Sequence, residues 1–282
     1  MAVAELSQGS VHYRESGAGA PVVFLHGYLM GGGLWDPVVR LLQGEFRCVV
    51  PELPFGAHPV PLRPDADLTA AGLGRLVAGF LDALDLRDVT LVGNDSGAAV
   101  AQVVAARHAG RLGGLVLATG DAFGNFPPAP FRPLIGAART STLTPLLALL
   151  KIRAARSLPT AYGWLTHGTL PHDLIDQWVA AYFADRGVRR DLRRLTAALG
   201  DDAFMHQIAG ELAAFAGPAL VAWAADDRFF PLEDGRRLAG ILPGARLEVI
   251  PGSRTWVMRD QPERTAELVA GLARRAAARP AA

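Results

Sequence analysis

The chain has 282 residues, and 50% of them are hydrophobic, which is enough to bury one large core. Its formal net charge of +1 gives no indication of binding to nucleic acid or to an anionic membrane. The only cysteine, Cys48, excludes an internal disulfide, and its apolar neighbours predict a small core residue. The N-terminal residues lack a basic start and an apolar h-region, and no apolar run could span a bilayer, so we expect a cytoplasmic protein.

Short apolar runs alternate with helical patterns over residues 1–120. The apolar runs predict strands at residues 11–13, 21–25, 47–51, 89–93 and 115–119. Helical periodicity predicts helices at residues 35–42, 69–84 and 96–108. Strand, helix and strand joined by short links predict parallel strands with right-handed crossovers.

The middle of the chain differs from both ends. Residues 121–210 show helical patterns, scattered prolines, many aromatic side chains and no clear strand. The earlier rhythm then resumes, with strands expected at 218–224 and 245–250 and helices at 232–241 and 261–276, before a tail at 279–282 that should fray. We therefore predict an α/β core made of residues 1–120 and 211–282, with a helical cap over 121–210.

The strongest motif is the segment Gly93-Asn94-Asp95-Ser96-Gly97, between an expected strand and an expected helix. It has the G-x-Nu-x-G form of a nucleophile elbow, with aspartate in the central position. Such a turn strains its central residue and needs small residues two positions away, which Gly93 and Gly97 supply. Asp95 should therefore project above the strand ends, where open α/β sheets bind ligands. The alternative is that Asp95 only caps the following helix.

A second motif, His26-Gly27-Tyr28, directly follows a buried apolar run. Together with the elbow it resembles the oxyanion loop of the α/β-hydrolase fold. The resemblance implies that the backbone N–H groups of Tyr28 and Ser96 hold a developing oxyanion, with His26 beside them in the site.

The resemblance extends to the C-terminal third of the chain, in the family's order of nucleophile, acid and final loop. Residues 222–231 resemble the segment that carries the acid, and their register favours Asp227, leaving Asp226 as a solvated loop carboxylate. Residues 249–262 resemble the last strand and loop, where the family keeps its catalytic histidine. Register places Thr255 at that position, followed by Trp256, and threonine cannot act as a base near neutral pH.

An aspartate nucleophile resembles the haloalkane dehalogenase and epoxide hydrolase branch. The implied chemistry is attack by Asp95 on carbon, followed by hydrolysis of the resulting ester. Two features depart from the dehalogenases, because Ser96 replaces the usual Trp and Tyr28 the usual Asn. Tyr162 and Tyr182 of the cap could donate to an epoxide oxygen, although simple packing within the cap is the competing role.

The missing histidine leaves three interpretations. In the first, another histidine replaces it; His58 follows an expected strand at the same sheet edge, and further candidates are His167, His172 and His206. Alternatively, Asp95 and Asp227 act as acid and base in a lyase, isomerase or cyclase reaction. In the third interpretation the site is catalytically inactive and only binds a ligand.

The remaining alternatives are weaker. Ser96 as an esterase nucleophile is one position late in the elbow. Asp121 could be a reserve acid, although packing or helix capping is its favoured role. No P-loop lysine and no metal-ligand spacing are present, so we expect no cofactor and no metal. The sequence thus predicts a cofactor-independent enzyme for a small hydrophobic substrate.

Overall fold

The computed structural model describes residues 1–140 and 142–278, so the tail expected to fray at 279–282 lies outside the described residues. Within them, one eight-stranded sheet has the spatial order β1 (Ala2–Leu6), β2 (Gly9–Ser16), β4 (Arg47–Pro51), β3 (Pro21–Leu25), β5 (Val89–Asp95), β6 (Leu112–Gly120), β7 (Ala219–Ala224) and β8 (Arg246–Ile250). The β1–β2 and β2–β4 pairs are antiparallel, and all pairs from β4 to β8 are parallel. The predicted, mostly parallel α/β-hydrolase sheet is confirmed.

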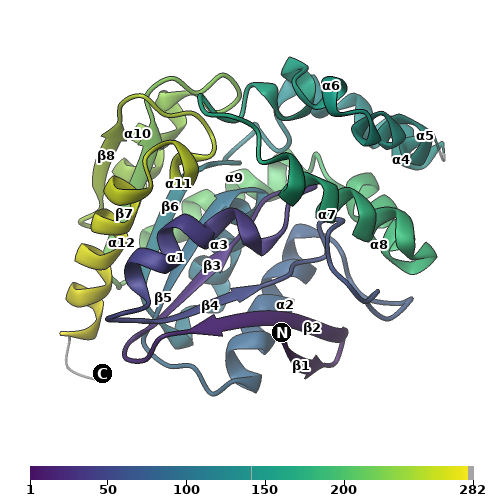
Figure 1. Cartoon of the computed structure of the whole chain (residues 1–282). Coiled ribbons are helices and arrows are strands. Elements are labelled where there is room, and N and C mark those ends of the chain that lie inside the picture. The colour runs from purple at the N-terminus through teal and green to yellow at the C-terminus, as the bar shows by residue number, and fades with distance from the viewer. Residues whose placement is uncertain (141, 279–282) are drawn as a thin grey trace.

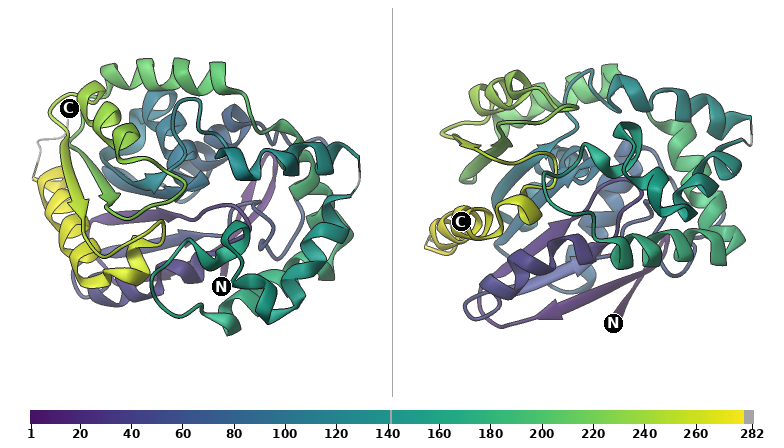
Figure 2. Two further views of the ribbon diagram at one scale, coloured as in Figure 1. Left: turned by 90° about the horizontal axis from the view of Figure 1, so that it is seen from above. Right: turned by 45° about the horizontal axis from the view of Figure 1, so that its top comes forward.

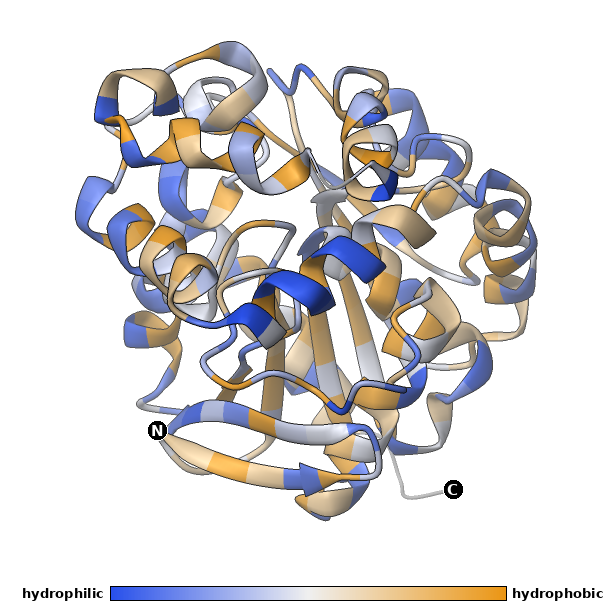
Figure 3. Cartoon of the chain, turned by 90° about the vertical axis from the view of Figure 1, so that its right-hand side faces the viewer, coloured by the Kyte–Doolittle hydropathy of each residue, from blue (hydrophilic) through white to orange (hydrophobic). Residues whose placement is uncertain are grey.

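The central strands are apolar because helices cover both of their faces. Every residue of β5 and β7 is buried, whereas only one of the five residues of β1, at the sheet edge, is buried. Cys48 in β4 is fully buried, as predicted, and burial raises the pKa of its thiol to about 11. In Figure 3 the strands inside the molecule are mostly apolar in colour, and the hydrophilic segments lie largely on the outer helices.

Helices lie on the two faces of the sheet (Figure 2). On one face α1 (Asp36–Leu42), preceded by η1 (Gly32–Trp35), packs against α12 (Pro262–Ala277), with α11 (Val257–Asp260) beside them. The other face carries α2 (Ala70–Ala83), α3 (Ser96–Arg107), η2 (Ala109–Arg111) and α10 (Leu232–Ile241). The predicted start of α2 is confirmed, because the Thr69 hydroxyl accepts from the Gly72 N–H at 3.1 Å.

Between β6 and β7 the chain forms a helical insertion that lies beyond the ends of the strands (Figure 1). Its elements are η3 (Ala129–Phe131), α4 (Pro133–Arg139), α5 (Leu143–Leu147), η4 (Ala148–Lys151), α6 (Arg153–Arg156), η5 (Pro159–Gly163), α7 (His172–Ala184), α8 (Arg186–Ala198), α9 (Asp202–Glu211) and η6 (Leu212–Ala214). The β-structure in its described part is limited to an isolated bridge between Ala122 and Asn125. The helix α9 packs on α3, so the last part of the predicted cap contacts the core directly.

None of the helices in residues 1–140 and 142–278 is long and apolar enough to cross a membrane.

Candidate active site

Asp95 ends β5 in a strained backbone conformation, with φ of 54° and ψ of −131°. The two flanking glycines are required by close backbone contacts. A Cβ on Gly97 would come within 2.6 Å of the Leu25 carbonyl oxygen, and one on Gly93 within 2.8 Å of the Ala98 Cα. The predicted need for small residues on both sides of Asp95 is therefore confirmed.

Two backbone amides converge on one oxygen of the Asp95 carboxyl group. The N–H of Tyr28 donates to Asp95 Oδ1 at 3.0 Å, and the N–H of Ser96 donates to the same oxygen at 2.7 Å. Because Tyr28 belongs to the loop after β3, helix capping alone does not account for this arrangement. The loop approaches so closely that a Cβ on Gly27 would overlap the Asp95 carboxyl group. These are the amides that the sequence proposed as oxyanion donors.

Burial of Asp95 raises the pKa of its carboxyl group. The two amides act in the opposite direction, and the charge of Asp227 adds to the increase.

A second carboxyl group, Asp121, lies next to the elbow. It follows β6, whose Gly120 pairs with Asp95, and the Ser96 hydroxyl donates to Asp121 Oδ2 at 2.8 Å. Asp121 is buried, and its Oδ1 has no hydrogen-bond partner within the described chain. Burial, and then the charge of Asp95, raise the pKa of Asp121 well above its usual range. Sequence reasoning favoured packing or capping here; the only available signal was its position directly after β6.

The structure brings Asp227 and Thr255 together, as their registers predicted. The Thr255 hydroxyl donates to Asp227 Oδ2 at 2.7 Å, and the N–H groups of Phe229 and Phe230 donate to Oδ1 at 2.7 Å. The Asn94 amide group donates to the Thr255 carbonyl at 2.8 Å, which ties this loop to the elbow. Both oxygens of Asp227 are thus engaged, and burial raises its pKa.

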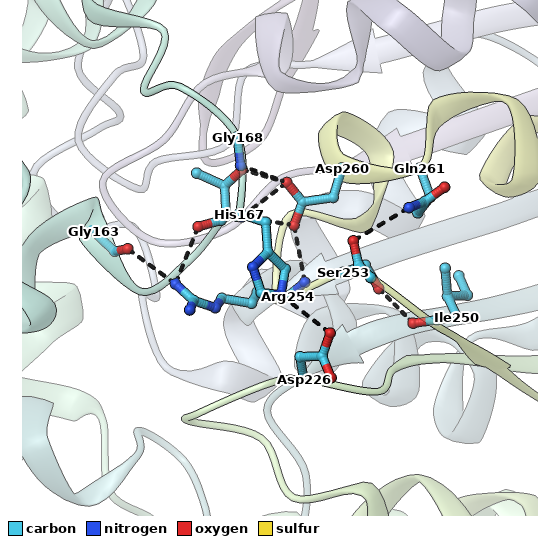
Figure 4. Close-up of polar contacts among 11 residues, drawn as sticks. Gly163, His167, Gly168, Asp226, Ile250, Ser253, Arg254, Asp260 and Gln261 are labelled. Carbon is cyan, nitrogen blue, oxygen red and sulfur yellow. Dashed lines mark hydrogen bonds and ion pairs between the residues drawn. The ribbon is translucent and has the colours of Figure 1, made fainter.

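The loop that carries Thr255 is anchored to the insertion (Figure 4). The backbone N–H of Arg254 donates to Asp260 at 2.9 Å, and Asp260 also accepts from the His167 N–H at 3.1 Å. The His167 ring contacts Asp226 Oδ2 at 3.1 Å, so this histidine is paired with the loop carboxylate.

No histidine of the described chain lines the cavity above Asp95. His58, the favoured replacement base, is buried 3.5 Å from Asp191 and outside the cavity, so its position gives no support to a catalytic role. His26 is held between the Gly27 carbonyl and the Leu53 N–H, and burial lowers its pKa to about 4, so it is a neutral, structural residue of the loop.

The cavity above Asp95 has a volume of about 280 Å³ and a mostly apolar lining from the insertion and the loop after β3. The polar residues that line it are Tyr28, Asp95, Ser96, Asp121, Thr160 and Tyr162. The structure places the remaining candidates, Asp227, Thr255, Trp256 and Tyr182, outside this lining.

The hydroxyl groups of the two candidate tyrosines in the insertion do not converge on the Asp95 carboxyl group. The Tyr162 hydroxyl donates to the Leu29 carbonyl at 2.8 Å, and the Tyr182 hydroxyl pairs with Thr144 at 2.8 Å. Trp256 is fully buried, and its ring lies 5.7 Å from that of Tyr162. The described residues contain no group of three or more His, Cys, Asp or Glu side chains suited to a metal ion.

The model of the α/β-hydrolase fold family matches residues 20–262. The chain belongs to the α/β-hydrolase fold family. It is 28% identical to a 2-hydroxy-6-oxo-6-phenylhexa-2,4-dienoate hydrolase of Burkholderia cepacia, over 89% of this chain and 86% of that protein. It is 27% identical to haloalkane dehalogenase 2 of Mycobacterium tuberculosis, over 93% and 91% of the two chains. These relatives are named hydrolases, and this α/β-hydrolase is an enzyme of the same superfamily.

Solved structures show the same fold. A putative ancestral haloalkane dehalogenase superposes with a TM-score of 0.79 at 22% identity, covering 99% of this chain and 100% of the other. An esterase of Thermogutta terrifontis superposes with a TM-score of 0.74 at 22% identity, covering 98% of each chain.

Proposed function

We propose that this α/β-hydrolase binds a small apolar substrate with an electrophilic carbon, of the haloalkane or epoxide kind, and that Asp95 attacks this carbon. The observation that carries the proposal is the convergence of the Tyr28 and Ser96 amides on Asp95 Oδ1. An oxyanion site that serves a substrate carbonyl would face the substrate, whereas here it holds an oxygen of the carboxyl group itself.

The geometry suits covalent catalysis by a carboxylate. With Oδ1 held by two N–H donors, Oδ2 is the oxygen left to attack carbon and displace the leaving group. Asp95 then becomes an ester whose carbonyl oxygen stays on the same amides. These amides would stabilise the oxyanion that forms when water later attacks the ester.

The cavity supports an apolar substrate. Leu146, Leu149 and Leu158 line it and are also 43%, 49% and 53% exposed, so they mark its opening on the insertion. Exposed leucines at an opening favour the entry of apolar molecules. Haloalkane dehalogenases are among the relatives that cover most of this chain, and their name describes the same substrate class.

Acid–base chemistry without a covalent intermediate is the second candidate. Asp227 does not suit it, because both of its oxygens accept hydrogen bonds and it does not line the cavity. Asp95 and Asp121 do line the cavity, and the pKa of each is raised, so this carboxyl pair could serve as acid and base.

Intact-protein mass spectrometry separates the two candidates. After incubation with bromohexane, we expect the wild-type mass to increase by one hexyl group, located on Asp95 by peptide mapping. Asp95→Asn should not gain this mass because an amide is a poor nucleophile. Asp173→Asn, at an aspartate whose side chain is 94% exposed, is the matched control and should react like the wild type. Alkylation at Asp173 or Ser96, or equal alkylation of Asp95→Asn, would contradict the proposal.

A further inference from the structure

We propose that Asp121 is the proton donor for an oxygen leaving group and then, once deprotonated, the base that activates water. Under this proposal an epoxide, and not a haloalkane, is the substrate class that the site can turn over. The inference rests on the proposed attack by Asp95 and supplies the base that Thr255 cannot provide.

The geometry joins the two carboxyl groups through one residue. Ser96 donates its N–H to Asp95 Oδ1 at 2.7 Å and its hydroxyl to Asp121 Oδ2 at 2.8 Å. Asp121 is 1% exposed and borders the cavity, and its Oδ1 is unpartnered among the described residues. A buried carboxyl oxygen without a partner costs free energy unless it is protonated or meets a ligand. Asp121 is thus suited to donate a proton to a bound substrate.

The two tyrosine hydroxyl groups of the cavity are occupied. The Tyr162 hydroxyl already donates to the Leu29 carbonyl, and the Tyr28 hydroxyl is paired with Thr196 at 2.7 Å. Burial raises the pKa of both phenols, which makes them poorer acids. The charge of Asp95 disfavours a second charge on Asp121, so the pair holds one proton while Asp95 is ionised.

In the first step, Asp95 Oδ2 attacks an epoxide carbon. The carbon–oxygen bond of the ring breaks, and its electron pair stays on the ring oxygen, which takes the Asp121 proton. The products are a β-hydroxyalkyl ester on Asp95 and a carboxylate on Asp121.

In the second step, the Asp121 carboxylate removes a proton from water as the water oxygen bonds to the ester carbon. The oxyanion that forms stays on the Tyr28 and Ser96 amides. Collapse breaks the bond to the alkyl oxygen, which takes the proton back from Asp121 and leaves as a diol. Asp95 is then the protonated member of the pair, which again holds one proton. This proton returns to Asp121, and Ser96 is hydrogen-bonded to both carboxyl groups.

A haloalkane follows a different course. Halide leaves with the electron pair of the carbon–halogen bond and needs no proton. Asp121 therefore stays protonated when the Asp95 ester forms, and a protonated carboxyl group cannot activate water. The ester should persist until Asp121 loses its proton to solvent.

The test compares bromohexane and hexene oxide, with ester measured by intact mass and diol by chromatography. Wild-type protein should accumulate the hexyl ester but release many equivalents of diol. In Asp121→Asn, which can still accept from Ser96, we expect the ratio of diol formation to hexyl-ester formation to fall at least about 100-fold. Asp121→Ala with added formate should recover diol formation, which a merely structural role would not allow. Asp226→Asn, an exposed carboxylate that does not line the cavity, is the control.

The outcomes distinguish the two proposals. If wild-type protein forms no hexyl ester on Asp95, the proposed function fails and this inference fails with it. If the ester forms but Asp121→Asn keeps the wild-type ratio, only the role of Asp121 is overturned. The role of Asp121 would also be overturned if Asp121→Ala forms the hexyl ester but releases no diol in the presence of formate.

Discussion

Thr255 donates its hydroxyl to a carboxyl oxygen of Asp227 and lies on a loop that Asn94 fastens to the nucleophile elbow. An imidazole at this position would have the Asp227 carboxylate to orient it, on a loop that is hydrogen-bonded to the residue before Asp95. A hydroxyl group instead satisfies Asp227 without providing a base. This single residue therefore decides whether the last loop can take part in ester hydrolysis.

Replacing Thr255 by histidine should shorten the lifetime of the hexyl ester. We expect Thr255→His to hydrolyse it at least about tenfold faster than the wild type, because a positioned base typically contributes more than this. Thr255 is fully buried, so the larger side chain should lower the free energy of unfolding by about 1–3 kcal/mol. Thr255→Val is the control without a base and should leave the lifetime unchanged. The lifetime is measured as the decay of the hexyl ester after alkylation. A folded Thr255→His variant with the same ester lifetime as the wild type would contradict the expectation.

At the scale of elements, the contact between the loop after β3 and the end of β5 forms the site. A methyl group on Gly27 would overlap the Asp95 carboxyl group. We expect Gly27→Ala to slow formation of the hexyl ester about 100-fold, because displacement of a reacting group by about 1 Å has an effect of this size. Gly79→Ala, in α2 with open space around its Cα, should leave the rate unchanged and raise stability by about 0.5–1 kcal/mol. Full activity in Gly27→Ala would contradict this expectation, because it would show that the loop moves to accommodate the methyl group.

The sequence predicted most elements of the core because their apolar runs are bounded by turn residues. The strands β3 and β4 and the helix α10 have the predicted bounds. The strand β1 was missed because its edge position leaves most of its residues exposed and removes the apolar signal. The short helices α4 to α6 were not separable, since prolines and breaks obscure a period that needs more than two turns.

The site was predictable only where a motif fixes the backbone. The elbow motif located Asp95. Counting from nearby prolines identified Asp227 and Thr255, which form a hydrogen bond in the structure. The orientation of side chains is not encoded in such motifs. His58 follows β4 but packs toward Asp191 of α8, whereas Asp121, directly after β6, borders the cavity. For Tyr162 and Tyr182 the sequence favoured packing over donation to an epoxide oxygen, and each hydroxyl group is paired with another residue of the chain.

For the whole molecule, a buried acid near the sheet edge carries a cost in stability that depends on pH. The pKa of Asp121 is raised above its usual 3.8 by burial and by the charge of Asp95, so the folded chain binds this proton more tightly than the unfolded chain. The free energy of unfolding therefore falls as pH rises from about 3.8 to the raised pKa. An asparagine has no such proton to lose and can still accept from Ser96.

Thermal unfolding of Asp121→Asn against pH tests this cost. We expect its Tm to exceed that of the wild type by about 2 °C or more at about pH 8, with the difference shrinking toward zero near about pH 4. Asp176→Asn is the opposite control. Arg156 and Arg153 lower the pKa of Asp176, so its stabilising effect is present above the unfolded pKa and is lost as pH falls. A Tm difference for Asp121→Asn that is constant with pH would mean that the pKa of Asp121 is the same in the folded and unfolded chains. Asp121 would then be a carboxylate near neutral pH and could not be the proton donor.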